Sequence, residues 1–186
     1  MPNTPTYNFP YPALTDDPNV PEDIQLLAQA VEDEIERVDS NVSLVLGAAQ
    51  AFTTALVATS QSTTSTTYAD LATVGPSVSV TTGTFAIVFF TATAWQNSAS
   101  ASDSILMSIA VSGATTIAAA DATAMRDTDV SGLSFARRYG NFVTFTTLTP
   151  GVNTFTAKYR TSNAANAANF GDRRIAVYAP TATLAS

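Results

Sequence analysis

The sequence contains neither cysteine nor histidine, and these two absences exclude several kinds of chemistry at once. Without cysteine there is no disulfide, zinc–thiolate site, iron–sulfur cluster or cysteine nucleophile. Without histidine the chain lacks the commonest general base and the commonest metal ligand. The sequence also contains no P-loop, dinucleotide fingerprint or Gly-x-Ser-x-Gly elbow. We therefore expect no enzyme, no catalytic residue and no cofactor.

Charged residues are scarce as well, at 12% of the 186 residues, against roughly 25% in an average soluble domain. The longest strongly apolar run, Phe85 to Phe90, is far shorter than the ~20 residues of a membrane-spanning helix. No Lys or Arg precedes Arg37, so we expect no signal peptide. The hydrophobic content of 46% argues against disorder. The net charge of −7 argues against a nucleic-acid binder that relies on bulk electrostatics.

The charge and the prolines are concentrated at the N-terminus. Residues 1–40 carry a net charge of −8, whereas residues 41–186 carry +1. Six of the nine prolines precede residue 22. The composition therefore predicts an extended arm over residues 1–20, a helix over residues 21–46 and a β domain over residues 47–186.

Three aromatic residues alternate in the arm, at Tyr7, Phe9 and Tyr11. The surrounding prolines favour an extended backbone, which would project the three rings to one side. The arm is then either an unstructured tail or a docking peptide whose aromatic rings enter pockets of a partner. Three aromatic residues in five favour the docking peptide, because exposed apolar groups of this size usually mark a contact site.

Apolar residues in the predicted helix recur at alternating steps of four and three. Pro21 suits the first helical turn, and Gly47 is a candidate C-cap, with the helix ending between about 39 and 46. A repeat of about 3.5 residues is typical of a coiled-coil seam. The seam residues are Ile24, Ala28, Val31, Ile35, Val38, Val42 and Val45.

One helix cannot bury its own seam. The seam packs either on the β domain of the same chain or on further copies of itself in a parallel bundle. We favour the bundle, although β-branched seam residues fit both dimers and trimers.

From residue 52 onward the apolar period changes to two, which indicates strands. About eight to ten short strands predict an antiparallel sandwich or jelly roll, so the fold class is mainly β. We expect the strand at Phe85 to Phe90 to be buried on both faces. Gly140-Asn141 and Pro150-Gly151 are expected to separate strands.

Polar clusters in the β domain are weak indicators of function. Asp127-Thr128-Asp129 offers two alternating carboxylates, whereas calcium needs about six to eight oxygens, so we expect no metal site. The doublets Arg137-Arg138 and Arg173-Arg174 could bind an anionic polymer, but adjacent strand residues point to opposite faces. Structural ion pairs with Asp103, Asp121, Asp129 or Asp172 are the favoured interpretation.

Three parts of the chain carry a family resemblance. At the N-terminus these are Asn8-Phe9-Pro10-Tyr11-Pro12 and residues 15–24 and 27–28; at the start of the β domain they are residues 55–59, 66–73 and 75–78; in the C-terminal segment they are residues 170–177. All three parts are similar to those of small structural proteins of tailed actinobacteriophages, usually labelled minor tail, tail-fibre or head-fibre proteins.

The resemblance implies a virion surface protein, made in the host cytoplasm and trimeric, with a jelly-roll-like knob. Its arm would attach it to a capsid or tail protein, with no nucleic-acid or membrane partner. The alternative is a receptor-binding knob that contacts host cell-envelope glycans through Trp95 and Tyr139. A depolymerase is the least favoured interpretation, because nothing in the spacing of the carboxylates selects a catalytic pair.

Overall fold

The computed structural model describes residues 20–49, 52–96, 103–128 and 136–180. The expected docking arm, with Tyr7, Phe9 and Tyr11, lies outside these residues. The chain divides into a helical segment that ends at Ala48 and a β domain, Ala49–Thr181, and each is described separately. None of the described helical residues forms an apolar segment long enough to cross a membrane.

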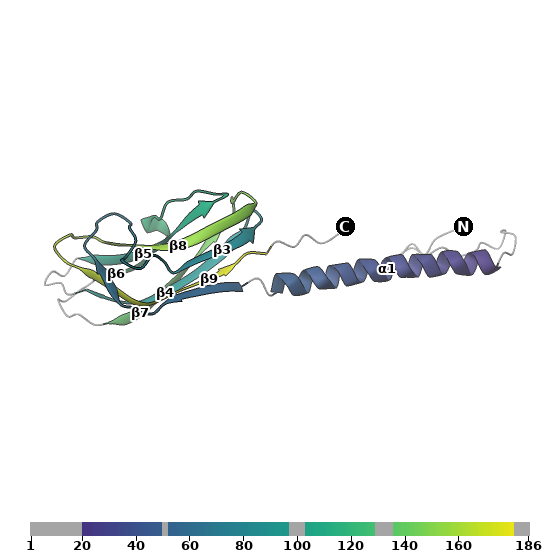
Figure 1. Cartoon of the computed structure of the whole chain (residues 1–186), viewed down its shortest axis with the longest axis horizontal. Helices are drawn as coiled ribbons and strands as arrows, with labels where there is room; N and C mark the ends of the chain where they lie inside the picture. The colour runs from purple at the N-terminus through teal and green to yellow at the C-terminus, as the bar shows by residue number, and fades with distance from the viewer. Residues whose placement is uncertain (1–19, 50–51, 97–102, 129–135, 181–186) are drawn as a thin grey trace. The chain divides into compact units, whose positions relative to one another are not determined.

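The helix α1 (Val20–Ala49) is continuous and extends three residues beyond the expected end at residue 46 (Figure 1). Gly47 therefore lies within the helix rather than at a C-cap. A single glycine costs only about 1 kcal/mol relative to alanine in a helix, and its neighbours Leu46 and Ala48 are strong helix formers.

The described part of the β domain contains nine strands and one short 3-10 helix, η1 (Asp121–Thr123). The strands are β1 (Phe52–Val57), β2 (Gln61–Thr63), β3 (Ser77–Thr82), β4 (Ala86–Gln96), β5 (Ser104–Gly113), β6 (Met125–Thr128), β7 (Arg137–Phe145), β8 (Gly151–Thr161) and β9 (Ala168–Tyr178).

The strands form two antiparallel sheets that lie face to face as layers (Figure 1). The first sheet has the order β1-β9-β4-β7, and β2 also pairs with β9; the second has the order β3-β8-β5-β6. From β3 onward the chain repeatedly crosses between the two sheets, so that its last strand lies between β1 and β4. This strand order is that of a jelly roll, which confirms the mainly β, jelly-roll-like part of the predicted fold class.

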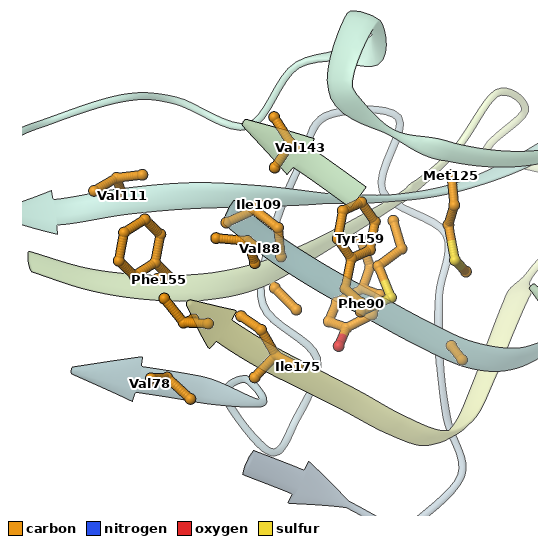
Figure 2. Close-up of a cluster of buried hydrophobic side chains, with 14 of the residues drawn as sticks. Val78, Val88, Phe90, Ile109, Val111, Met125, Val143, Phe155, Tyr159 and Ile175 are labelled. Carbon is orange, nitrogen blue, oxygen red and sulfur yellow. The ribbon is translucent and has the colours of Figure 1, made fainter. Parts of the chain in front are cut away.

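The hydrophobic core lies between the two sheets (Figure 2). Val88 and Phe90 of β4 project from the first sheet, and Ile109 of β5 and Phe155 of β8 project from the second; all four are at most 1% exposed. Every second residue of β4 is buried, as expected for a strand with one face on a core. The outward face of β4 is less covered, and Phe89 on it is 43% exposed.

The expected strand break at Gly140-Asn141 was wrong. Gly140 and Asn141 lie in the middle of β7, paired with Thr91 and Phe90, instead of in a turn. A Cβ at Gly140 would lie 3.0 Å from Cγ2 of Thr91, so glycine here permits a close approach between β7 and β4. Local sequence marks glycine as a breaker, but cross-strand packing overrides this tendency.

Candidate interaction surfaces

The first candidate surface is the apolar seam of α1. Within the chain, five of its large side chains are between 37% and 62% exposed, and Ala28 is also exposed. The five are Ile24, Val31, Ile35, Val38 and Val42. The side chain of Val45 lies outside the description. A stripe of this size without a cover is typical of a helix that binds another helix.

Acidic side chains flank this seam. Residues 20–49 contain seven carboxylates and a single cation, Arg37. Arg37 Nη2 donates to Glu34 Oε1 over 2.6 Å, and Nε donates to Oε2 over 2.8 Å. This hydrogen bonding lowers the pKa of Glu34 below its usual value. The seam is therefore apolar along its centre and negatively charged along its margins.

The second candidate surface is on the outward face of the first β sheet. Phe52 of β1, Tyr178 of β9, Phe89 of β4 and Phe142 of β7 form a row across four strands, which we call the aromatic patch. The ring centroids lie 5.1 Å apart for Phe52–Tyr178, 6.4 Å for Phe52–Phe89 and 5.9 Å for Phe89–Phe142. Phe52 and Phe142 are 55% and 60% exposed. Burial of β4 on both faces, as expected from sequence, is therefore wrong for this chain.

A shallow groove of about 520 Å³ adjoins the aromatic patch. Leu56, Phe89 and Ala176 supply apolar side chains to its lining, and Thr54, Thr91 and Arg174 supply polar groups. Leu56 is itself 52% exposed. The groove can therefore hold an apolar group beside hydrogen-bond donors.

An ion cluster lies beside this groove. Asp172 pairs with Arg138 and with Arg174, whose Nε and Nη2 lie 3.2 and 3.1 Å from Oδ1. The register between β4 and β9 shifts here, so that Asp172 and Arg173 together oppose Ala92. Asp172 has the left-handed φ of +46° that such a bulge can require.

This arrangement separates the two members of the Arg173-Arg174 doublet. Arg174 joins the surface ion cluster, whereas Arg173 is fully buried. The pairing of Arg138 and Arg174 with Asp172 confirms the structural interpretation for one member of each doublet. Arg173 instead donates to the Gly75 carbonyl and to Gln61 Oε1. Asp121 likewise binds Arg160, and Asp103 accepts hydrogen bonds from Asn163 and Asn166.

The outward face of the second sheet has a different chemistry. Hydroxyl pairs Ser77–Thr156 and Ser79–Thr154, each 2.8 Å apart, link β3 to β8. Lys158 of β8 pairs with Asp70, with 2.7 Å between Nζ and Oδ2. This face is polar where the outward face of the first sheet is aromatic.

Tyr68 belongs to a polar cluster beside β8. Its hydroxyl donates to Asp121 Oδ1 over 3.0 Å, and the guanidinium carbon of Arg160 lies 5.5 Å from its ring centroid. Arg160 also pairs with Asp121. Burial raises the pKa of Tyr68 to about 12, and the hydrogen bond to Asp121 acts in the same direction.

The residues predicted to contact glycan are not brought together. Trp95 lies on the outward face of the first sheet, half-buried and opposite Asn169. Tyr139 pairs with Ala92, whose side chain is fully buried, and packs against the core on the inner face. Among the residues that the structure describes, no group of three or more carboxylates could hold a metal ion.

The aromatic patch was not predictable as a surface from the sequence. The period-two pattern around Phe89 was visible, but it does not distinguish a face covered by the same chain from an exposed one. Phe52 and Phe142 belong to strands that are distant in sequence, and only the sheet order places them beside Phe89.

No family model matches the sequence, and no curated protein matches it. Among solved structures, the chain is similar to the TNF Eiger from S. frugiperda, with 11% identity and a TM-score of 0.45 over 72% of this chain and 96% of that chain. A structure of infectious bursal disease virus, Gt strain, has 10% identity and a TM-score of 0.38 over 69% of this chain and 32% of that chain. The CBM22-1 xylan-binding domain from Paenibacillus barcinonensis Xyn10C has 14% identity and a TM-score of 0.34 over 70% of this chain and 87% of that chain.

Proposed function

We propose that the chain is a structural protein of a bacteriophage particle that acts as a trimeric decoration or short fibre at the virion surface. Three copies associate through α1, and the arm with Tyr7, Phe9 and Tyr11 attaches them to a capsid or tail protein. The uncovered apolar seam of α1 is the observation that carries this proposal. The resemblance of the sequence to phage tail-fibre and head-fibre proteins supports the assignment to a virion.

The geometry of the seam supports self-association. Ile24, Val31 and Val38 recur at intervals of seven, as do Ala28 and Ile35 in the alternate position. In a parallel bundle the same positions of each copy face one another, and each side chain inserts between four residues of a neighbour. The carboxylates then lie at the margins of the bundle, in contact with water.

Sedimentation of the full chain tests this self-association. We expect the wild type to sediment as a trimer and the double variant Val31→Asp/Val38→Asp to sediment as a monomer, because a carboxylate in the seam would be buried without a partner. The matched control, Gln29→Asp/Ser40→Asp, adds the same charge at two exposed positions outside the seam and should remain a trimer. A wild-type chain that is monomeric would overturn the proposal.

A second measurement tests the virion assignment. Mass spectrometry of purified phage particles, followed by electron microscopy with a labelled antibody, should find the protein on the capsid or tail surface. Detection only in the host lysate, with none on intact particles, would contradict the assignment even if the chain is a trimer.

The groove beside Phe89 favours a second candidate function, recognition of host cell-envelope glycan by the β domain. An apolar ring next to Arg174 and Thr91 can stack on a sugar while polar groups bind its hydroxyls. Binding of the full chain to a glycan array, lost in Phe89→Ala and retained in Tyr139→Phe, would support this function. Failure to bind envelope glycans of a host that the phage infects would rule it out.

A further inference from the structure

The aromatic patch presents a preformed apolar surface. Its rings are in contact in the pairs Phe52–Tyr178, Phe52–Phe89 and Phe89–Phe142. The three phenylalanines nevertheless remain 43% to 60% exposed. Single exposed apolar residues are ordinary on protein surfaces, but a contiguous aromatic group usually marks a binding surface. The adjoining groove extends this surface through Leu56, which is also exposed.

Chain connectivity limits how far Phe52, one member of the aromatic patch, can lie from the axis of any parallel α1 bundle. Helix α1 ends at Ala49, and Phe52 follows three residues later, so their Cα atoms are at most about 11 Å apart. Packed helices lie about 8–10 Å apart, so each Phe52 stays within roughly 20 Å of the bundle axis. Chain connectivity thus keeps the Phe52 residues of neighbouring copies within reach of one another.

The two outward faces of the β domain differ in polarity, and this difference indicates which face a neighbouring copy would cover. The face of the second sheet carries the hydroxyl pairs Ser77–Thr156 and Ser79–Thr154 and the Lys158–Asp70 ion pair. Burial of that face would remove polar groups from water with little apolar gain. The face of the first sheet offers aromatic area instead.

Charge at the margin of the patch is also compatible with close packing of copies. Arg138 and Arg174 share Asp172, so the ion cluster beside the groove carries two positive charges against one negative charge. The residues after position 40 carry a net charge of only +1. Copies of the β domain can therefore approach without strong repulsion.

We propose that the aromatic patch is the surface through which the β domains of neighbouring copies pack around the bundle axis. This interface rests on the proposed association of α1 and extends it from the helix into the β domain. The occupant of the patch is the same surface of further copies, because chain connectivity brings them close. A glycan or another protein would be an alternative occupant.

The absence of native cysteine permits a direct test with single cysteines. Thr54→Cys places a thiol in the groove beside Phe89, and Ser79→Cys places one on the outward face of the second sheet; both positions are exposed in the single chain. After sedimentation shows that both variants are trimers, we measure maleimide labelling of the full chain, relative to the urea-unfolded chain. We expect Thr54→Cys to react at least roughly tenfold more slowly than Ser79→Cys, and to form intermolecular disulfides on oxidation.

Three further variants test whether the slow labelling of Thr54→Cys depends on the interface. In the Val31→Asp/Val38→Asp background, Thr54→Cys should label as fast as Ser79→Cys. Phe142→Ser should raise labelling of Thr54→Cys in the trimer, whereas Val152→Ser should leave it unchanged. Phe142 and Val152 are exposed to nearly the same extent, at 60% and 59%, but Val152 lies on the second sheet.

The outcomes separate this inference from the proposed function. A monomeric wild-type chain overturns both. A trimer in which Thr54→Cys and Ser79→Cys label equally fast overturns only the interface. Protection that appears in a trimer only after addition of polysaccharide extracted from the host envelope would overturn it in favour of glycan.

Discussion

Arg173 extends its guanidinium over the ring of Tyr159 in the fully buried interior of the β domain, with 5.3 Å between the guanidinium carbon and the ring centroid. The guanidinium donates hydrogen bonds to backbone carbonyls and to Gln61 Oε1. Nη1 lies 3.2 Å from Gly75 O, and Nη2 lies 2.9 Å from Gln61 Oε1. The hydroxyl of Tyr159 donates to the same Gly75 carbonyl over 2.9 Å. The pair therefore ties the segment between β2 and β3 to strands β8 and β9.

This relationship predicts that Arg173→Ala strongly destabilises the β domain. Removal of the guanidinium leaves a cavity and takes one hydrogen-bond donor away from both the Gly75 carbonyl and Gln61 Oε1, so the free energy of unfolding should fall by on the order of 3 kcal/mol. Urea unfolding followed through Trp95, the only tryptophan, measures this change. In the matched control Arg174→Ala, where the side chain is 56% exposed, the loss should stay below about 1 kcal/mol. Equal losses would contradict the structural role of Arg173.

The raised pKa of Tyr68 predicts that the β domain loses stability at alkaline pH. Because the pKa of Tyr68 is raised from 10.0 to about 12, the unfolded chain releases the phenolic proton at lower pH than the folded chain. The contribution of the protonated Tyr68 hydroxyl to the free energy of unfolding is fully present below pH 10 and is lost as the pH rises toward about 12. Tyr68→Phe should therefore show a smaller decline in unfolding free energy over this window than the wild type.

Urea unfolding at a series of alkaline pH values, together with tyrosinate absorbance, measures this decline. Asp121→Asn should also reduce it, because the hydrogen bond from Tyr68 to Asp121 contributes to the raised pKa. Identical declines in the wild type and Tyr68→Phe would show that Tyr68 is not responsible.

The bulge at Asp172 predicts a difference between two substitutions at one position. Asp172→Val places a β-branched residue at a φ of +46° and should cost about 1–3 kcal/mol. Asp172→Asn retains a side chain that tolerates this conformation and loses only ion pairs with exposed partners, so its cost should remain within about 1 kcal/mol. Thermal unfolding of both variants provides the comparison. Equal losses for Asn and Val, both of which remove the ion pairs, would assign the stability to the ion cluster instead.

The Arg173-Arg174 doublet illustrates how far sequence reasoning extends. Alternation along a strand correctly predicted that the two side chains point to opposite faces. It did not predict that one is buried without a carboxylate partner, because the acceptors Gly75 and Gln61 are about a hundred residues away in the chain. Asp172 was predicted to be a candidate ion-pair partner. That it pairs with both Arg138 and Arg174 depends on a bulge in the β4–β9 pairing, which the sequence did not predict.

The candidate surfaces show the same division. The seam of α1 was predictable because helical periodicity acts within a few residues. The aromatic patch was not, because Phe89 meets Phe52 and Phe142 only through sheet pairing. Trp95 and Tyr139 were selected by residue type, and the sheet places them on opposite faces.

The sequence by itself determined that an acidic segment with a heptad seam precedes a nearly neutral β domain that lacks cysteine and histidine. These properties are compositional or local, and a period of 3.5 or two residues is specified by neighbours along the chain. Only the tertiary structure decided the jelly-roll strand order, the burial of Arg173 and the exposure of Phe89. Each of these depends on which distant strands pair, and that pairing is set by packing of the whole core.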